Sequence, residues 1–85
     1  MPAQTFGFDD LKTILVDRVG LTEAVVKDDP DLTFEEMGLD SLALVEIQLA
    51  MEQDYGFTIA DADADRIQTV GEAIDYVNRR LAEQV

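Results

Sequence analysis

Apolar residues recur every three or four positions over two long stretches of the chain, the spacing that gathers them on one face of an α-helix. In residues 8–19 the stripe begins at Phe8 and ends at Val19, and Gly20 follows as a helix stop. In residues 69–82, Thr69 and Glu72 have the spacing of a capping box that opens a helix. The pattern therefore predicts a first and a last amphipathic helix.

A long connection, residues 21–38, follows the first helix and contains the turn-forming run Asp-Asp-Pro-Asp at 28–31. Thr33 and Glu36 are spaced to cap one short turn. We expect three apolar side chains to anchor this loop on the core, namely Leu32, Phe34 and Met37.

A second long helix is predicted at Ser41–Tyr55, between the N-cap residue Asp40 and the stop at Gly56. Residues 57–59 are apolar enough for a buried connection, and residues 61–67 predict a short, irregular helix. The whole pattern predicts an all-α fold: a small four-helix bundle, with three main helices, a short third helix and a long first loop. At 85 residues the chain fits a single domain, 1–85.

The second helix is apolar on two faces. One stripe, assigned to the core, consists of Leu44, Ile47 and Met51; the other consists of Leu42, Val45 and Leu49. A bundle of this size cannot easily bury every side of one helix, so the second stripe, flanked by Glu46 and Glu52, becomes a candidate partner surface. The alternative is that these residues widen the core stripe, with Val45 the first candidate to do so.

Composition limits the chemistry. The chain has neither cysteine nor histidine, which removes a protein thiolate, the commonest general base and any Ser-His-Asp triad. An independent enzyme is not expected. Residues 1–10 lack the features of a signal peptide, and no run reaches the about 20 apolar residues that span a bilayer. We expect a cytoplasmic monomer.

The formal net charge of −13 argues against binding to nucleic acid or to an anionic membrane, and favours protein partners with basic patches. The charge is also unevenly placed, because no basic residue lies between Lys27 and Arg66. The alternative is an acidic surface that serves solubility alone.

Residues 38–42, Gly-Leu-Asp-Ser-Leu, resemble the attachment motif of acyl carrier proteins, and the resemblance extends in order over residues 34–37, 54–59 and 69–74. It implies that Ser41 carries 4′-phosphopantetheine, whose thiol holds acyl groups as thioesters. Nothing in the chain can activate Ser41 as a nucleophile. The resemblance therefore implies modification by a phosphopantetheinyl transferase that uses coenzyme A and magnesium, with Asp40 and Leu42 beside the attachment point.

Residues 41–46 and 64–67 are similar to the free-standing carriers of type II (aromatic) polyketide pathways, since Ala43 stands where fatty-acid carriers usually have a polar residue. This implies that polyketide intermediates are shuttled between a ketosynthase, an acyltransferase and tailoring enzymes with basic docking patches. The implied docking residues are Leu42, Val45, Glu46, Leu49 and Glu52. The growing chain would rest between the second and third helices, near Arg66. One departure is Ala60, where many relatives have proline.

Several alternatives stay open. Arg66 either contacts polar groups of a bound polyketide or forms a salt bridge with Asp63 or Glu72. The chain could instead carry fatty acids or peptidyl groups, although the acidic second helix disfavours the peptidyl type. From other classes, it could be a purely structural module or a calcium-binding protein. Asp61, Asp63, Asp65 and Glu72 have calcium-loop spacing, but Arg66 stands where such a loop needs glycine.

Overall fold

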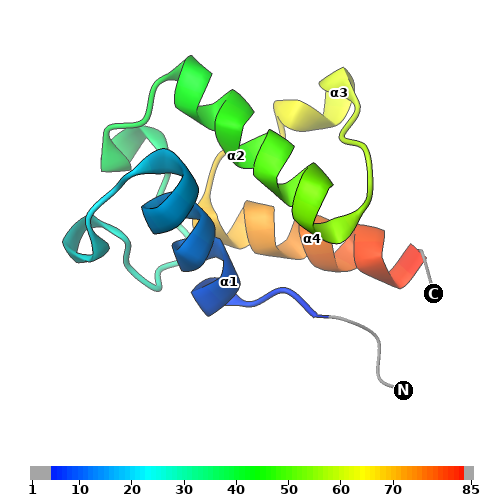
Figure 1. Ribbon diagram of the computed structural model, residues 1–85, viewed down its shortest axis with the longest axis horizontal. Helices are drawn as coiled ribbons and strands as arrows, with labels where there is room; N and C mark the ends of the chain where they lie inside the picture. Colours follow the sequence, from blue (N-terminus) through cyan, green and yellow to red (C-terminus); the bar gives the residue numbers. More distant parts are fainter. Residues whose placement is uncertain (1–4, 84–85) are drawn as a thin grey trace.

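The computed structural model describes residues 5–83, within which the fold is helical (Figure 1). The elements in chain order are α1 (Phe8–Thr13), η1 (Ile14–Val19), η2 (Glu23–Val25), η3 (Glu35–Met37), α2 (Ser41–Tyr55), α3 (Asp61–Ala64) and α4 (Val70–Glu83). In Figure 1, α2 and α4 lie one above the other, with α1 and η1 on one side and α3 on the other. The predicted all-α bundle with a long first loop is confirmed; the outermost residues of the predicted domain, 1–4 and 84–85, lie outside the described part.

The predicted first helix is present over its full length but changes its winding. It is α-helical as far as Thr13 and then π-helical through η1. Gly20 ends it with a φ of 90°, the left-handed geometry that glycine adopts without strain. Leu11, Ile14 and Leu15 are buried, so the wider turn still presents the apolar stripe to the core.

Both ends of α2 follow from local chemistry. At the start, the Asp40 carboxylate accepts a hydrogen bond of 2.9 Å from the Ala43 N–H. This bond satisfies one of the N–H groups that the first turn of a helix leaves without a partner. At the end, Gly56 has a φ of 77°. The predicted bounds of the second helix are therefore confirmed.

The third helix is shorter than predicted. α3 ends at Ala64, and only turn hydrogen bonds, such as Arg66 N–H to the Asp63 carbonyl over 2.9 Å, continue toward Ile67. Ala60 occupies the N-cap position with a φ of −69°. That angle lies in the range to which proline is fixed, so the chain keeps the entry geometry here without a proline.

The last helix begins with the predicted capping box. The Thr69 hydroxyl accepts from the Glu72 N–H, and the Glu72 carboxylate accepts from the Thr69 N–H, each over 3.1 Å. The long loop is attached beside it, because the Val70 N–H donates to the Leu32 carbonyl and the Gly71 N–H to the Pro30 carbonyl. The Thr33–Glu36 cap of η3 is also present.

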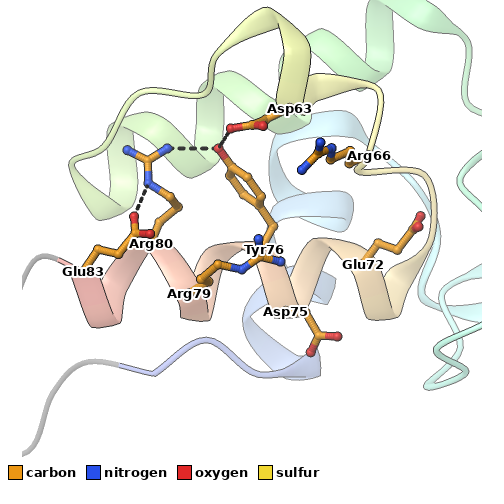
Figure 2. Close-up of a pocket in the computed structure, with 8 residues that line it drawn as sticks. All are labelled: Asp63, Arg66, Glu72, Asp75, Tyr76, Arg79, Arg80 and Glu83. Carbon is orange, nitrogen blue, oxygen red and sulfur yellow. Dashed lines mark hydrogen bonds and ion pairs between the residues drawn. The ribbon is translucent and has the colours of Figure 1, made fainter.

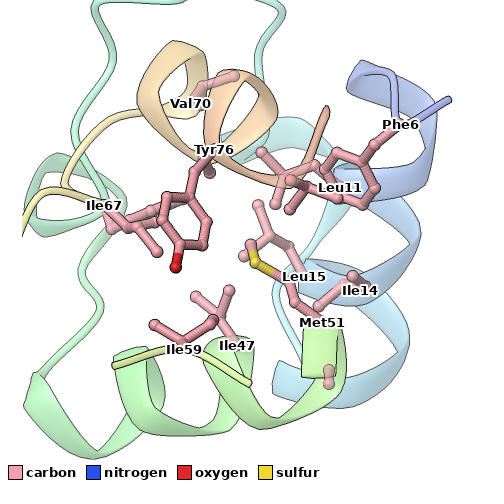
Figure 3. Close-up of a cluster of buried hydrophobic side chains, with 14 of the residues drawn as sticks. Phe6, Leu11, Ile14, Leu15, Ile47, Met51, Ile59, Ile67, Val70 and Tyr76 are labelled. Carbon is pink, nitrogen blue, oxygen red and sulfur yellow. The ribbon is translucent and has the colours of Figure 1, made fainter. Parts of the chain in front are cut away.

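The core collects side chains from every long element (Figure 3). Of the predicted core stripe of α2, Ile47 and Met51 are buried, whereas Leu44 is only half-buried at the edge. In the loop, Phe34 and Met37 are buried, and the half-buried Leu32 packs against the core. The connection 57–59 buries Phe57 and Ile59 and leaves Thr58 exposed, as expected for a connection rather than a strand.

Phe6, which precedes the first helix, is a core residue that the periodicity did not reveal. It is buried and packs edge-on against Tyr55, with ring centroids 5.1 Å apart. The Asn78 side chain holds the Phe6 backbone twice, since it accepts from the N–H and donates to the carbonyl. This pairing joins the start of the described chain to α4. None of the described helices is long and apolar enough to cross a membrane.

Candidate functional site

Ser41 is the first residue of α2 and is exposed. The preceding residues set its position: Gly38 turns the chain with a φ of 86°, Leu39 is buried in the core, and Asp40 caps the helix. Its hydroxyl makes no hydrogen bond to any residue in the described range, 5–83. The fold therefore presents an unengaged hydroxyl at a fixed point on the surface.

This position suits a phosphodiester. The free N–H groups and the dipole at the start of a helix favour a phosphate there, and α2 is a 15-residue helix whose start faces solvent. Ser41 is also the only serine in the chain. Threonine hydroxyls are present elsewhere, but the one at the start of a long helix, that of Thr69, is engaged in the capping box of α4.

The second apolar face of α2 is exposed, as predicted. The exposed fractions are 68% for Leu42, 49% for Val45 and 47% for Leu49. The alternative that Val45 widens the core stripe is wrong, because about half of its side chain is exposed and it is not among the residues that pack against the core. The exposed stripe begins one residue after Ser41.

The two acidic residues beside this stripe differ in their surroundings. Glu46 is exposed and lines a shallow hollow of about 250 Å³ together with Leu49. Glu52 is half-buried, and its Oε2 accepts a hydrogen bond of 2.6 Å from the Ile59 N–H. Glu52 therefore holds the connection after α2, a contact that the sequence did not reveal.

Arg66 lies beside a larger hollow of about 480 Å³ between α3 and α4 (Figure 2). Within the described residues it forms neither of the considered salt bridges. Its two candidate partners are engaged elsewhere: the Asp63 carboxylate accepts from the Tyr76 hydroxyl over 3.0 Å, and Glu72 caps α4. The guanidinium of Arg66 is exposed and faces this hollow.

Tyr76 is the polar centre of that region, and the sequence did not reveal its role. Its hydroxyl donates to Asp63 and accepts from Arg80 Nη1 over 2.9 Å. Arg80 also donates to the Thr58 carbonyl over 2.7 Å and lies 5.2 Å from the centroid of the Phe57 ring. Burial raises the pKa of the Tyr76 hydroxyl above 10.0, against the opposing effect of the Arg80 hydrogen bond.

The acidic run 61–65 does not assemble a calcium loop. Asp63 is bonded to Tyr76 and Glu72 to the backbone at 68 and 69. Among residues 5–83, no group of three or more acidic side chains is placed to hold one ion. The geometry thus gives the calcium alternative no support.

Comparison with known proteins agrees with this geometry. The family described as "phosphopantetheine attachment site" matches residues 9–77. An acyl carrier protein of Solidesulfovibrio magneticus is 40% identical over 76 residues, covering 88% of this chain and 95% of its relative. The holo acyl carrier protein of actinorhodin synthesis from Streptomyces coelicolor is 40% identical, with a TM-score of 0.80, over 99% of this chain and 100% of that one. The octanoyl form from the actinorhodin polyketide synthase has the same identity and coverage and a TM-score of 0.84.

The chain therefore belongs to the acyl carrier proteins, the family that bears a phosphopantetheine attachment site. Its cofactor is a phosphopantetheine prosthetic group. As an acyl carrier protein it is a non-catalytic carrier that is modified by a phosphopantetheinyl transferase. Its role implies synthase enzymes as further partners. The resemblance to type II polyketide carriers is confirmed by its solved structural relatives.

Proposed function

We propose that this protein carries polyketide intermediates on a 4′-phosphopantetheine arm attached to Ser41. The observation that carries the attachment is the single serine of the chain, exposed and unengaged at the capped start of α2. When bound, the arm supplies the thiol that this cysteine-free chain lacks, and that thiol holds acyl groups as thioesters.

In the attachment reaction, this chain supplies the acceptor oxygen and the transferase supplies the base. The Ser41 oxygen forms the new O–P bond to the phosphopantetheine phosphorus, the pyrophosphate bond of coenzyme A breaks, and adenosine 3′,5′-bisphosphate leaves. No residue of the described chain is hydrogen-bonded to the Ser41 hydroxyl, so the serine proton passes to a base of the transferase. Asp40 fixes the first turn of α2 and adds a negative charge beside the acceptor. Incubation with coenzyme A and a broad-specificity transferase, followed by intact mass measurement, tests this attachment.

The exposed face of α2 is the surface on which we place the transferase and the synthase enzymes. Leu42, Val45 and Leu49 supply an apolar strip, and Glu46 supplies an exposed negative charge beside it. A strip of this kind, with charge at its rim, fits a partner that presents apolar groups and a basic patch. Glu52 contributes through its charge and through the connection that it holds.

The polyketide assignment rests on two observations. The first is that the actinorhodin carrier matches over essentially its whole length. The second is that Ala43 and residues 64–67 resemble the corresponding residues of type II polyketide carriers. Arg66, exposed beside the hollow between α3 and α4, is the residue that we place against polar groups of the bound intermediate. The carrier form loaded with 3,5-dioxohexyl, described as a triketide mimic, belongs to that same relative.

A fatty-acid carrier is the second candidate, because the relative from Solidesulfovibrio is named only as an acyl carrier protein. To separate the two, the holo protein is given malonyl groups and either the ketosynthase of a type II polyketide pathway or a fatty-acid ketosynthase. Our proposal predicts elongation with the polyketide enzyme and little with the fatty-acid enzyme. The reverse preference would assign the protein to fatty-acid synthesis.

A further inference from the structure

An ion pair between the first helix and α2 stands at the edge of the docking face. Arg18, in the last turn of η1, contacts Asp54 near the end of α2, with Nη2 and Oδ1 2.7 Å apart. The side chains remain 45% and 39% exposed. No basic residue lies between Lys27 and Arg66 in the sequence. The fold thus brings a cation from outside this segment to one end of α2.

The pair adjoins the apolar strip directly. The hollow of about 250 Å³ on this side of α2 is lined by Arg18, Glu46, Leu49, Ala50 and Gln53. Leu49 belongs both to this hollow and to the exposed strip. A partner that covers Leu49 therefore comes close to the Arg18 guanidinium.

The negative charge of α2 is consequently graded along the helix. Toward the C-terminal end, Asp54 is neutralised by Arg18, and Glu52 is engaged with the Ile59 N–H. Toward the N-terminal end, Asp40 and Glu46 are exposed and no cation is paired with either within residues 5–83. A basic group on a partner is therefore attracted more strongly near Ser41 than where the helix ends, where it meets the Arg18 guanidinium.

We propose that Arg18 is a specificity-determining residue that limits the docking face to the first three turns of α2. The partner that this surface fits has a cationic side chain opposite Glu46 and an uncharged side chain over Leu49 and the hollow. It has no cation opposite Asp54. A partner whose basic patch extends along the whole helix meets Arg18 and is disfavoured. This inference rests on the docking face proposed above.

The test uses a broad-specificity phosphopantetheinyl transferase as the partner, with its KM for the carrier measured at low and at high salt. The variants are Arg18→Ala, Asp54→Asn, the double variant and Glu46→Gln. An exposed ion pair contributes little to stability, so these variants are expected to fold, which circular dichroism checks. Lys12→Ala is the matched control, because Lys12 also pairs with a carboxylate, Glu23, over 3.5 Å, but borders a hollow that α2 does not line.

At low salt, we expect Arg18→Ala to lower KM about two- to threefold, because Asp54 is unmasked, and Asp54→Asn to raise it by a similar factor. The double variant returns close to the wild type, kcat stays constant, and high salt removes the differences. Lys12→Ala leaves KM nearly unchanged. A structural defect in Arg18→Ala would raise KM instead, so the sign of the change distinguishes the two explanations.

Two results overturn the inference about Arg18 but leave the docking face in place. In the first, Glu46→Gln raises KM, whereas Arg18→Ala leaves KM unchanged or raises it. In the second, Lys12→Ala lowers KM as much as Arg18→Ala does. Failure of the docking face itself has a different signature. In that case Glu46→Gln leaves KM unchanged at low salt, whatever Arg18→Ala does.

Discussion

The Tyr76 hydroxyl is hydrogen-bonded to Asp63 Oδ2 over 3.0 Å and thereby joins α4 to α3. α3 has only four residues, none of them buried. Its position depends on the buried residues on either side, Ile59 and Ile67, and on this polar contact. Arg80 completes the contact from the next turn of α4, over 2.9 Å.

Removal of this hydroxyl in Tyr76→Phe should lower the free energy of unfolding by about 0.5–1.5 kcal/mol, the net contribution of a partly buried hydrogen bond. Tyr55→Phe is the matched control, because within the described residues the Tyr55 hydroxyl makes no hydrogen bond, although its ring packs on Phe6. Urea unfolding of both variants measures the difference. Equal effects would show that the Tyr76–Asp63 contact does not stabilise the fold.

Gly71 is required for the close approach of the long loop to α4. A Cβ at this position would lie 2.8 Å from Pro30 Cβ and 3.0 Å from the Pro30 carbonyl oxygen. Neither atom can rotate away. Gly71→Ala should therefore destabilise the protein by about 1–3 kcal/mol, although alanine favours a helix interior by up to about 1 kcal/mol.

Thermal or urea unfolding measures this loss. The helix preference alone is obtained from Asp75→Ala against Asp75→Gly, at an exposed position of the same helix. A Gly71→Ala protein as stable as the wild type would mean that the loop does not pack here as described.

The pH dependence of stability should include a contribution from Glu36. Hydrogen bonds from the Thr33 backbone and then from its hydroxyl lower the pKa of this carboxyl below its ordinary value of 4.5. Because the folded-state pKa is depressed, the stabilisation is complete above the unfolded value and is lost as the pH falls through the folded value.

Unfolding in urea from neutral pH to about pH 3 measures the effect. Glu36→Gln keeps an acceptor for Thr33 but has no titration, so its stability should fall less in acid than that of the wild type. Glu35→Gln, at an exposed neighbour whose side chain makes no hydrogen bond within residues 5–83, should follow the wild type. If Glu36→Gln also follows the wild type, the Thr33 contact does not favour the ionised form.

The apolar strip of α2 should matter for docking and little for folding. Val45→Thr keeps the shape of a 49% exposed side chain and adds a hydroxyl. We expect kcat/KM of the transferase to fall about three- to tenfold, with the free energy of unfolding changed by less than about 1 kcal/mol. Val25→Thr, at an exposed apolar residue outside α2, is the control and should leave both quantities unchanged. A similar loss in both variants would remove Val45 from the contact surface.

The sequence predicted the parts of the fold that depend on local chemistry. Asp40, Gly56 and the Thr69–Glu72 box define helix ends within a few residues, so α2 and α4 were placed correctly. The exposed face of α2 also followed from spacing alone, because a small core can cover only one side of that helix.

The features that were missed depend on contacts between distant segments. Nothing near Phe6 in sequence indicates that Asn78 holds its backbone, and nothing near Tyr76 indicates that Asp63 and Arg80 engage its hydroxyl. Likewise, nothing in the sequence indicates that the connection after α2 places the Ile59 N–H beside the Glu52 carboxylate. The π-helical winding of η1 leaves the apolar stripe unchanged, so periodicity could not reveal it.

We propose Ser41 as the single attachment point for phosphopantetheine. The most direct test is intact mass measurement, with fragmentation to locate the added group, after incubation with coenzyme A and a transferase proven active on another carrier. We expect one phosphopantetheine per chain, on Ser41, with none in Ser41→Ala and full loading in Thr22→Ala, which alters another exposed hydroxyl. An unmodified wild type, or a Ser41→Ala protein that still gains the group, would contradict it.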